Sequence, residues 1–278
     1  MEFVRKIVET DSLAKWNHLH FIGDVHLGAT GHNAKIFNEK LKEIEDDPLA
    51  LWFGMGDYGD HIYFNDPRFS PNEQDEGLTM VELRSGIMKQ IRSLSEKFEP
   101  IKDKCVGLGT GNHEETIAKR YHVDPTRELC YLLGSAYLGY SSLNTITFRH
   151  SQSNGKKGRS ATLRVYTNHG HGGGRRNGSQ LNKIEDAIRI AEADIYAMGH
   201  VHGKTGSQLE IIGSCNRGKE RKKVKTFVVT GCYQDVSRPS KMTYAERNMY
   251  AQSPLGSPMV GVRWTGSSNK DMRTRIAL

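Results

Sequence analysis

The sequence predicts an α/β sandwich built from mixed strands, on two observations. Short apolar runs alternate with amphipathic helical segments along the chain, as in parallel sheets whose strands are joined by helices. The second half is richer in hairpin patterns, which join antiparallel strands. Because both kinds of connection occur in one chain, mixed sheets are favoured over a simple doubly wound sheet. The sequence contains no convincing linker, so we expect a single domain over residues 1–278.

Apolar runs predict three buried strands in the first half of the chain, at residues 20–23, 49–54 and 105–108. In the second half, two pairs of runs flank turn-forming segments and predict hairpins that join residues 144–150 to 161–168 and residues 209–213 to 224–231. A further strand is expected at residues 194–199. Residues 63–77 contain two prolines and several turn residues, which predicts a long loop.

Apolar side chains at spacings of three and four residues predict the helices. Asn33 is a suitable N-cap for a first helix that buries Phe37, Leu41 and Ile44. The second helix has the clearest pattern, which runs through Met80, Leu83, Ile87, Ile91, Leu94 and Phe98. A third helix is expected through Ile184, Ala187, Ile188 and Ala191.

The composition is that of a soluble protein. Hydrophobic residues make up 36% and charged residues 26% of the 278 positions, which argues against disorder. No apolar run approaches the roughly 18–20 residues that cross a bilayer. The N-terminal segment lacks the apolar core of a signal peptide, so we expect a cytoplasmic protein without membrane contact. The cysteines match no zinc or CxxC pattern, so buried, reduced thiols are expected at Cys105, Cys130, Cys215 and Cys232.

A formal net charge of +7 favours anionic partners and is compatible with nucleic acid. Positive charge is dense in the two predicted hairpin turns, at Lys156, Lys157 and Arg159 and at Arg217, Lys219, Arg221, Lys222, Lys223 and Lys225. Such clusters suit a nucleic-acid backbone. They equally suit solvated hairpin tips, where Lys and Arg discourage edge pairing between sheets. The sequence leaves these two interpretations open, and it leaves the oligomeric state open.

Five clusters of Asp, His and Asn each follow a predicted strand. They are residues 23–26 (GDVH), 56–60 (GDYGD), 109–114 (GTGNHE), 168–174 (NHGHGGG) and 199–203 (GHVHG). Any one of them alone could be a polar turn or a glycine loop. Jointly they are hard to explain by chance, because sites in α/β sheets form where the loops at the carboxyl ends of strands converge. Alternate histidines bounded by glycines indicate metal ligands, since imidazole is the commonest transition-metal ligand.

In their order, the clusters resemble the motif set of the calcineurin-like metallophosphoesterase superfamily. The resemblance spans Asp24 to His202, and no motif is missing. It implies a four-layer α/β/β/α sandwich of two mixed sheets flanked by helices. It also implies a phosphoesterase with two divalent metal ions. The segment at residues 244–264 (YAERNMYAQSPLGSPMVGVRW) further resembles the end of metallophosphoesterases from bacteriophage genomes.

The resemblance also implies a division of roles among the side chains. Asp24, His26 and His202 would hold one metal. The second metal would be held by Asn112, His169 and His200, and Asp57 would bridge both. His113 would act on the leaving group, and Asp60 would orient it.

One position departs from the protein phosphatases of this family, which carry Arg directly after the second Asp of the GDxxD motif. This chain has His61 there, which is a candidate substrate contact and puts protein-phosphatase activity in doubt. Arg175 and Arg176 could supply the missing positive charge, or they could be solvated loop residues. His171 could contact substrate or support a ligand.

This ligand set predicts hydrolysis by direct attack of a metal-bridging hydroxide, with His113 protonating the leaving oxygen. Nitrogen and oxygen ligands without thiolate suit Mn²⁺, Fe²⁺, Zn²⁺ or Ni²⁺, and we take Mn²⁺ as the working ion. The expected substrate is a phosphodiester, in a nucleic acid or a nucleotide. A small phosphomonoester is the alternative, and a fold that binds metal without catalysis ranks below both.

Overall fold

The structure is a computed structural model that describes residues 1–62, 66, 80–150, 159–174, 176–214, 218, 220–239, 242–265 and 271–278. Its strands form two six-stranded sheets. The first sheet has the order β1 (Glu2–Thr10), β6 (Ser141–His150), β7 (Arg159–Asn168), β8 (Ile195–Met198), β10 (Glu220–Thr230) and β9 (Lys204–Ser214). The second sheet has the order β12 (Asp271–Ala277), β11 (Met259–Thr265), β2 (Asn17–Ile22), β3 (Ala50–Gly54), β4 (Cys105–Gly109) and β5 (Tyr137–Gly139).

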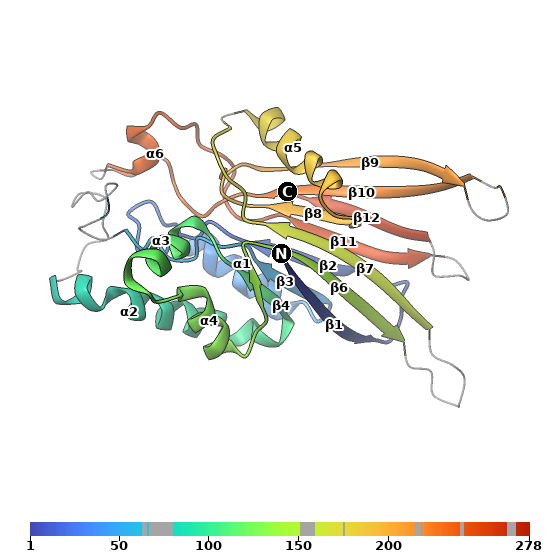
Figure 1. The fold of residues 1–278 in the computed structure, drawn as a ribbon, viewed down its shortest axis with the longest axis horizontal. Coiled ribbons are helices and arrows are strands. Elements are labelled where there is room, and N and C mark those ends of the chain that lie inside the picture. The colour runs from blue at the N-terminus through green and yellow to red at the C-terminus, as the bar shows by residue number, and fades with distance from the viewer. Residues whose placement is uncertain are drawn as a thin grey trace.

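Both sheets are mixed. In the first, β1 is parallel to β6, and β7, β8 and β10 are parallel to one another, whereas β6–β7 and β9–β10 are antiparallel hairpins. In the second, β2, β3, β4 and β5 are parallel, and the hairpin β11–β12 is added antiparallel to β2. Strands β2, β3, β4, β5, β7, β8 and β10 therefore end on one side of the molecule, whereas β1 and β6 run the opposite way (Figure 1).

Three apolar clusters hold four layers together. The central cluster contains Phe21 and Phe53 from the second sheet and Ile146 and Val228 from the first, so the two sheets pack face to face. Helix α5 (Asn177–Glu185) and the 3₁₀ helix η3 (Asp186–Arg189) cover the outer face of the first sheet through the cluster that contains Ile184. The predicted α/β sandwich, with the four layers that the resemblance implies, is confirmed.

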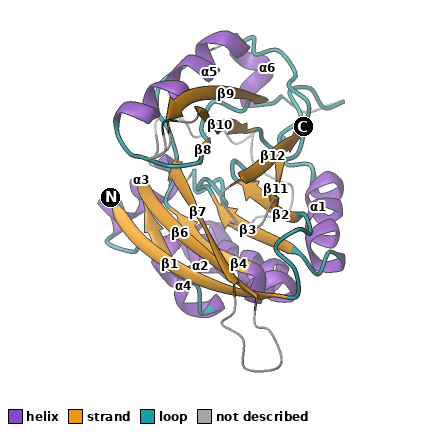
Figure 2. Ribbon diagram, turned by 90° about the vertical axis from the view of Figure 1, so that its right-hand side faces the viewer, coloured by secondary structure: helices purple, strands orange, loops and turns teal. Residues whose placement is uncertain are grey.

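Helices cover the outer face of the second sheet (Figure 2), and a third apolar cluster joins them to that sheet. It joins α1 (Ala34–Asp46), α2 (Met80–Phe98), the 3₁₀ helix η2 (Glu99–Lys104) and α4 (Pro125–Leu133) to that sheet. Its aromatic centre is Trp52 stacked on Phe98, with a centroid distance of 4.8 Å. Two shorter helices, α3 (Asn112–Tyr121) and α6 (Tyr244–Arg247), lie toward the end at which the parallel strands finish (Figure 1).

Local sequence signals set several of these elements. The side chain of Asn33 accepts a hydrogen bond from the amide of Ile36 and caps α1, as predicted. The predicted buried face of α1, formed by Phe37, Leu41 and Ile44, is confirmed. Cys105, Cys130 and Cys232 are buried, free thiols, whereas Cys215 lies outside the described residues.

The structure differs from the predicted elements in several places, and the helices α3, α4 and α6 and the strands β5, β11 and β12 were not predicted. The third predicted helix begins earlier, at Asn177, and tightens into the 3₁₀ helix at Asp186. Strand β1 was not predicted, because what fixes it is parallel pairing with β6, for example Glu2 beside Ser142. The predicted loop at residues 63–77 lies outside the described residues apart from Asp66.

Candidate metal centre

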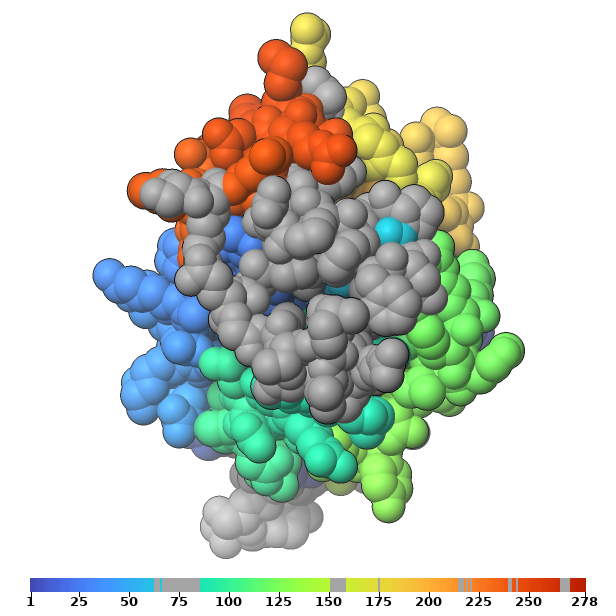
Figure 3. Space-filling view, turned by 90° about the vertical axis from the view of Figure 1, so that its left-hand side faces the viewer, coloured from blue at the N-terminus to red at the C-terminus, as the bar shows by residue number. Residues whose placement is uncertain are grey.

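All five polar clusters follow the carboxyl ends of strands. The first three follow β2, β3 and β4 of the second sheet, and the last two follow β7 and β8 of the first. A hydrogen bond from a side chain to the main chain joins the two sets, since Nδ1 of His169 donates to the carbonyl oxygen of Met55 at 2.7 Å. Figure 3 shows the face at this end of the molecule, which α1, α2, α3 and α6 border. The predicted ligands are therefore brought together from both sheets.

The first group is formed by Asp24, His26 and His202, whose candidate ligand atoms all lie within 4.8 Å of one another. Nε2 of His26 lies 3.2 Å from Nε2 of His202, which lies 3.4 Å from Oδ1 of Asp24. Asp24 is fully buried and accepts hydrogen bonds from the amide of His200 and from the hydroxyl of Thr230. Burial raises the pKa of Asp24 to about 8, so a cation is needed to keep it ionised at neutral pH.

The second group is formed by Asp57, His169 and His200, with Asn112 between them. Oδ1 of Asn112 lies 3.0 Å from Nε2 of His169 and 2.8 Å from Nδ1 of His200. Partial burial lowers the pKa of His200 to about 4, which leaves this imidazole neutral and able to bind a metal. Burial disfavours a charged His169, but the carboxylates of Asp57 and Asp24 raise its pKa to about 10.

Asp57 lies between the two groups. Its Oδ2 is 3.3 Å from Nε2 of His169 and 3.9 Å from Nε2 of His26. Its Oδ1 accepts a hydrogen bond from the amide of His113 at 3.0 Å. One oxygen is thus fixed by the main chain, and the other faces a ligand of each group. This is the arrangement that a bridging carboxylate requires.

The backbone at the candidate ligands is unusual. Five of them have positive φ: 51° at Asp24, 47° at His26, 53° at Asp57, 70° at His200 and 57° at His202. A non-glycine residue in the left-handed region costs about 1–3 kcal/mol and persists only where its surroundings determine it. The loops therefore hold these side chains in orientations that relaxed loops would not adopt.

Two glycines allow the loops to approach closely enough. A Cβ at Gly111 would overlap Oδ1 and the amide nitrogen of Asp57. A Cβ at Gly56, which has φ of 89°, would overlap the backbone of Gly111 and lie 2.8 Å from Nδ1 of His169. These glycines of the motifs are required by packing against the second metal group.

His113 and Asp60 also meet beside the ligands. The ring of His113 lies edge-on to that of His26, with centroids 4.6 Å apart, and its Nδ1 contacts the main-chain oxygen of Asp60. The Asp60 carboxylate lies 3.6 Å from Nδ1 of His26. Candidate ligand atoms of His26, Asp60 and His113 all lie within 4.8 Å. Asp60 is therefore placed to orient both histidines, by its main chain and by its carboxylate.

The four residues predicted to contact substrate differ in how far they are buried. His61 is 2% exposed, its ring lies over Gly59, and Nε2 is 4.0 Å from Oε1 of Glu114. His171 and Arg176 are exposed beyond the end of β7. Arg175 lies outside the described residues. His61 thus belongs to the buried shell around the ligands, while His171 and Arg176 face solvent.

Two residues that support the cluster have no role predicted from the sequence. Glu114 is 1% exposed and accepts main-chain hydrogen bonds from two of the loops. The ring of Tyr140 lies edge-on to His169, and its hydroxyl donates to the carbonyl oxygen of Gly170 at 2.7 Å. Glu114 could have been found from its position three residues after Gly111, which is that of a capping box. Tyr140 has no such sequence signal.

The residues fit two divalent transition metals. The set offers two carboxylates, one amide oxygen and four imidazoles, without thiolate, which suits ions such as Mn²⁺, Fe²⁺, Zn²⁺ or Ni²⁺. Nδ1 of His26 is buried without a hydrogen-bond partner, and Nε2 of the same ring faces another imidazole nitrogen. At 3.2 Å one neutral ring can donate its N–H to the other, and a cation can take the place of that proton.

The described basic residues Arg159, Lys222 and Lys223 lie away from the cluster, while Lys156, Lys157, Arg217 and Lys219 lie outside the described residues. Strand β7 runs from Arg159, beside the first turn, to Asn168, at the cluster, and its ten residues span about 30 Å. In the second turn, Lys222 pairs with Glu210 at 2.9 Å. Lys225 was predicted to belong to this positive surface, and that prediction is wrong. Its side chain is buried and donates to the carbonyl oxygen of Ala193.

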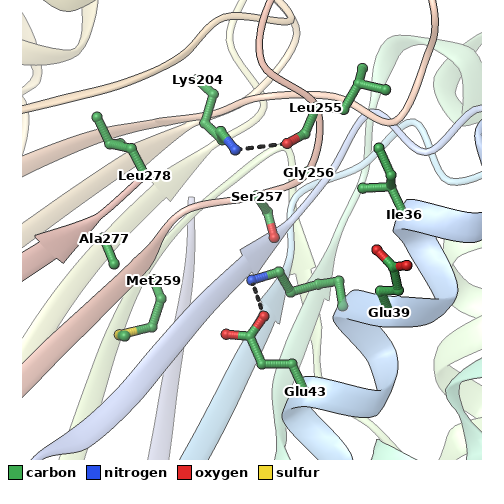
Figure 4. Close-up of a pocket in the computed structure, with 11 residues that line it drawn as sticks. Ile36, Glu39, Glu43, Lys204, Leu255, Gly256, Ser257, Met259, Ala277 and Leu278 are labelled. Atoms are coloured by element: carbon green, nitrogen blue, oxygen red, sulfur yellow. Dashed lines mark hydrogen bonds and ion pairs between the residues drawn. The ribbon is translucent and has the colours of Figure 1, made fainter.

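One cavity lined by described residues is separate from the candidate ligands. It measures about 320 Å³ and lies between α1 and the segment around Ser257, with Lys204, Glu39 and Glu43 in its wall (Figure 4). Lys204 donates to the carbonyl oxygen of Leu255 at 2.7 Å. Among the described residues, no helix is long and apolar enough to cross a membrane.

Comparisons with known proteins give no close relative. No family model matches the chain, and no curated protein matches it. One similar solved structure is a conserved uncharacterized protein from Streptococcus pneumoniae, described as a predicted phosphoesterase. It has a TM-score of 0.36 and 10% identity, over 95% of this chain and 99% of that one.

Another similar structure is Vps29 from Chaetomium thermophilum. It has a TM-score of 0.32 and 11% identity, over 94% of this chain and 96% of that one. At these TM-scores neither match decides the fold or the function of this chain. Neither comes from a bacteriophage, so the resemblance of residues 244–264 to phage enzymes stays a prediction.

Proposed function

We propose that this protein is a metal-dependent phosphoric ester hydrolase of the calcineurin-like metallophosphoesterase superfamily, and that it cleaves phosphodiesters. One observation carries the proposal. Seven oxygen and nitrogen donors from five loops converge at the carboxyl ends of strands from both sheets, and they divide into two groups around Asp57.

In this proposal Asp24, His26 and His202 hold one divalent ion, Asn112, His169 and His200 hold the other, and Asp57 contacts both. When bound, two such ions supply positive charge to the phosphate oxygens and lower the pKa of water toward neutrality. The protein holds the donors rigidly through left-handed backbone and main-chain hydrogen bonds. Little reorganisation is then needed when substrate binds.

His113 is the proposed general acid. Protonated on both nitrogens, its ring can donate Nδ1–H to the main-chain oxygen of Asp60 and Nε2–H to the leaving oxygen. Its position beside His26 keeps it next to the first metal group. A well-placed general acid contributes about 10²–10⁴-fold to the rate.

The charge of the described residues beside the cluster favours a diester substrate, and Arg175 lies outside those residues. The position at which the family's protein phosphatases carry Arg holds His61, and its ring is buried against Gly59. Arg176 is exposed at the start of α5. A phosphodiester carries one negative charge and a monoester two, so a site with fewer cations suits the diester.

The test is a substrate panel with Mn²⁺. We expect faster hydrolysis of bis-p-nitrophenyl phosphate than of p-nitrophenyl phosphate, and turnover of DNA, RNA or cyclic nucleotides within the panel. Faster turnover of the monoester would replace the proposed substrate class with phosphomonoesters. If two metals bind and no phosphoester in the panel is hydrolysed, the protein is a metal-binding scaffold and the proposed activity is wrong.

A further inference from the structure

A buried carboxylate that is not a candidate ligand joins two of the loops. Glu114, on the first turn of α3, is 1% exposed. Its Oε2 accepts from the amides of Asp57 at 2.9 Å and Gly111 at 3.0 Å, and its Oε1 accepts from the amide of Tyr58 at 2.8 Å. One side chain thus receives three main-chain hydrogen bonds, two of them from the loop after β3 and one from the loop after β4.

The two loops that Glu114 joins carry the centre of the site. The loop after β3 holds Asp57, and the loop after β4 leads into Asn112 and His113. A second link runs in the same direction, since the amide of His113 donates to Oδ1 of Asp57. Asp57 is therefore held through its main chain by Glu114 and through its side chain by the start of α3.

A role as a helix cap does not account for all of these contacts. A capping box at the start of α3 needs only the hydrogen bond from Gly111. The other two bonds leave the helix and reach residues 57 and 58, and residue 57 has φ of 53°. A left-handed Asp persists only where its surroundings determine it, and the carboxylate of Glu114 is the group that fixes both amides there.

We propose that Glu114 is a positioning residue that holds the Asp57 loop in the conformation that directs Oδ2 of Asp57 between the two metal groups. The effect of Glu114 on catalysis rests on the proposed function. We call the three hydrogen bonds from the two loops to Glu114 the clamp. The clamp does not rest on the proposed function, because the exchange of the loop amides and the metal affinity can be measured without any hydrolysis.

Glu114→Gln is the sharpest variant, because Gln keeps the size of the side chain. Its amide has one acceptor oxygen and a donor NH₂ group, so at least one main-chain N–H would face another donor. Glu115→Gln is the matched control. Glu115 is the next residue of the same helix turn, is 43% exposed, and pairs with Lys119 at 2.7 Å.

The first measurement is amide hydrogen exchange in the metal-free protein. In Glu114→Gln we expect faster exchange at Asp57, Tyr58 and Gly111, with the strands of both sheets as protected as in the wild type. Glu115→Gln should leave all three amides unchanged. Unchanged exchange in Glu114→Gln would overturn the proposal. So would equal acceleration throughout both sheets, because that would show a general structural role.

The second measurement is Mn²⁺ titration, with electron paramagnetic resonance to detect coupling between two ions. Loss of a group that orients a ligand typically lowers metal affinity about 10–100-fold. We expect that loss and weaker coupling in Glu114→Gln. Because Glu114 acts through Asp57, adding Glu114→Gln to Asp57→Asn should lower the affinity no further. Additive losses would overturn the proposal.

Two further outcomes are informative. If Glu114→Gln does not fold, Glu114→Asp takes its place, since it keeps the charge but is too short to reach both loops. Weakened metal binding in Glu114→Asp, with a melting temperature near that of the wild type, would support the clamp, and wild-type metal binding would overturn it. If the wild type binds two Mn²⁺ without hydrolysing any ester, the proposed function fails while both measurements still test the clamp.

Discussion

The two ends of the strands in this protein differ in how far their side chains are buried and held in place. At the carboxyl ends, buried donors are held by glycines, positive φ angles and main-chain hydrogen bonds. At the hairpin end, Arg159, Lys222 and Lys223 are exposed, and the two lysines pair with acidic side chains. About 30 Å of strand separates the two ends.

The described basic residues of the hairpins and the candidate metal ligands therefore lie at opposite ends of the strands. The described hairpin residues Arg159, Lys222 and Lys223 lie away from the candidate metals, so they do not act on the reacting phosphate directly. A nucleic acid held by the hairpins would have to extend along the molecule to reach the cluster. Changes at the carboxyl ends should therefore alter metal binding and rate, and changes at the hairpins should alter association alone.

The largest effect is expected from Gly111→Ala. The added Cβ would overlap Oδ1 and the amide of Asp57, and neither can move without displacing the centre of the site. Misplacement by about 1 Å can lower a rate about 100-fold, and we expect at least that loss of kcat/KM with bis-p-nitrophenyl phosphate. In Gly178→Ala the new Cβ meets nothing within 4 Å, so the rate should stay within about twofold. Equal activity of the two variants would refute the packing argument.

The second-largest effect is expected from His113→Ala. We expect a loss of about 10²–10⁴-fold with a poor leaving group such as phenol, and a smaller loss with p-nitrophenol, which needs less protonation. Both metals should remain bound, as measured by metal content after gel filtration. The control is His150→Ala, at the hairpin end of β6, which should leave rate and metal content unchanged. Full activity of His113→Ala on the phenyl ester would remove this residue from the mechanism.

A smaller and different effect is expected from the double variant Lys222→Glu with Lys223→Glu. If the hairpin contacts a nucleic-acid backbone, single-stranded DNA should bind more weakly, and the slope of log K against log salt should fall by roughly 1–2. Hydrolysis of bis-p-nitrophenyl phosphate should not change, because the substrate does not reach the hairpin. Unchanged DNA binding would leave the hairpins as solvated tips, and slower diester hydrolysis would contradict the separation of the two ends.

The smallest effect concerns the buried thiols. Burial raises the pKa of Cys105, Cys130 and Cys232 to about 12, against about 8.5 for an exposed thiol. Below pH 12 the folded protein therefore keeps them protonated and unreactive. Iodoacetamide at pH 8 should modify none of the three until the protein is unfolded, as peptide mass mapping would measure. Rapid modification of any of them in the native state would show that its surroundings open.

Several features could be predicted from local sequence because local physics sets them. The cap at Asn33 and the apolar face through Phe37 and Leu41 depend on neighbouring residues alone, and both are confirmed. The five polar clusters were located because glycines and histidines at a strand end form a pattern within one short segment. Strand β1 was missed because what fixes it is pairing with β6, far along the chain.

The sequence by itself determined the donors: which Asp, His and Asn residues are present, and that each group follows a strand. The tertiary structure decided their relations, because a contact between two loops depends on how the sheets pack. It places Oδ2 of Asp57 between His169 and His26, it joins the loops through Glu114, and it separates the basic hairpins from the cluster. It also buries Lys225, whose position in a basic segment had predicted exposure.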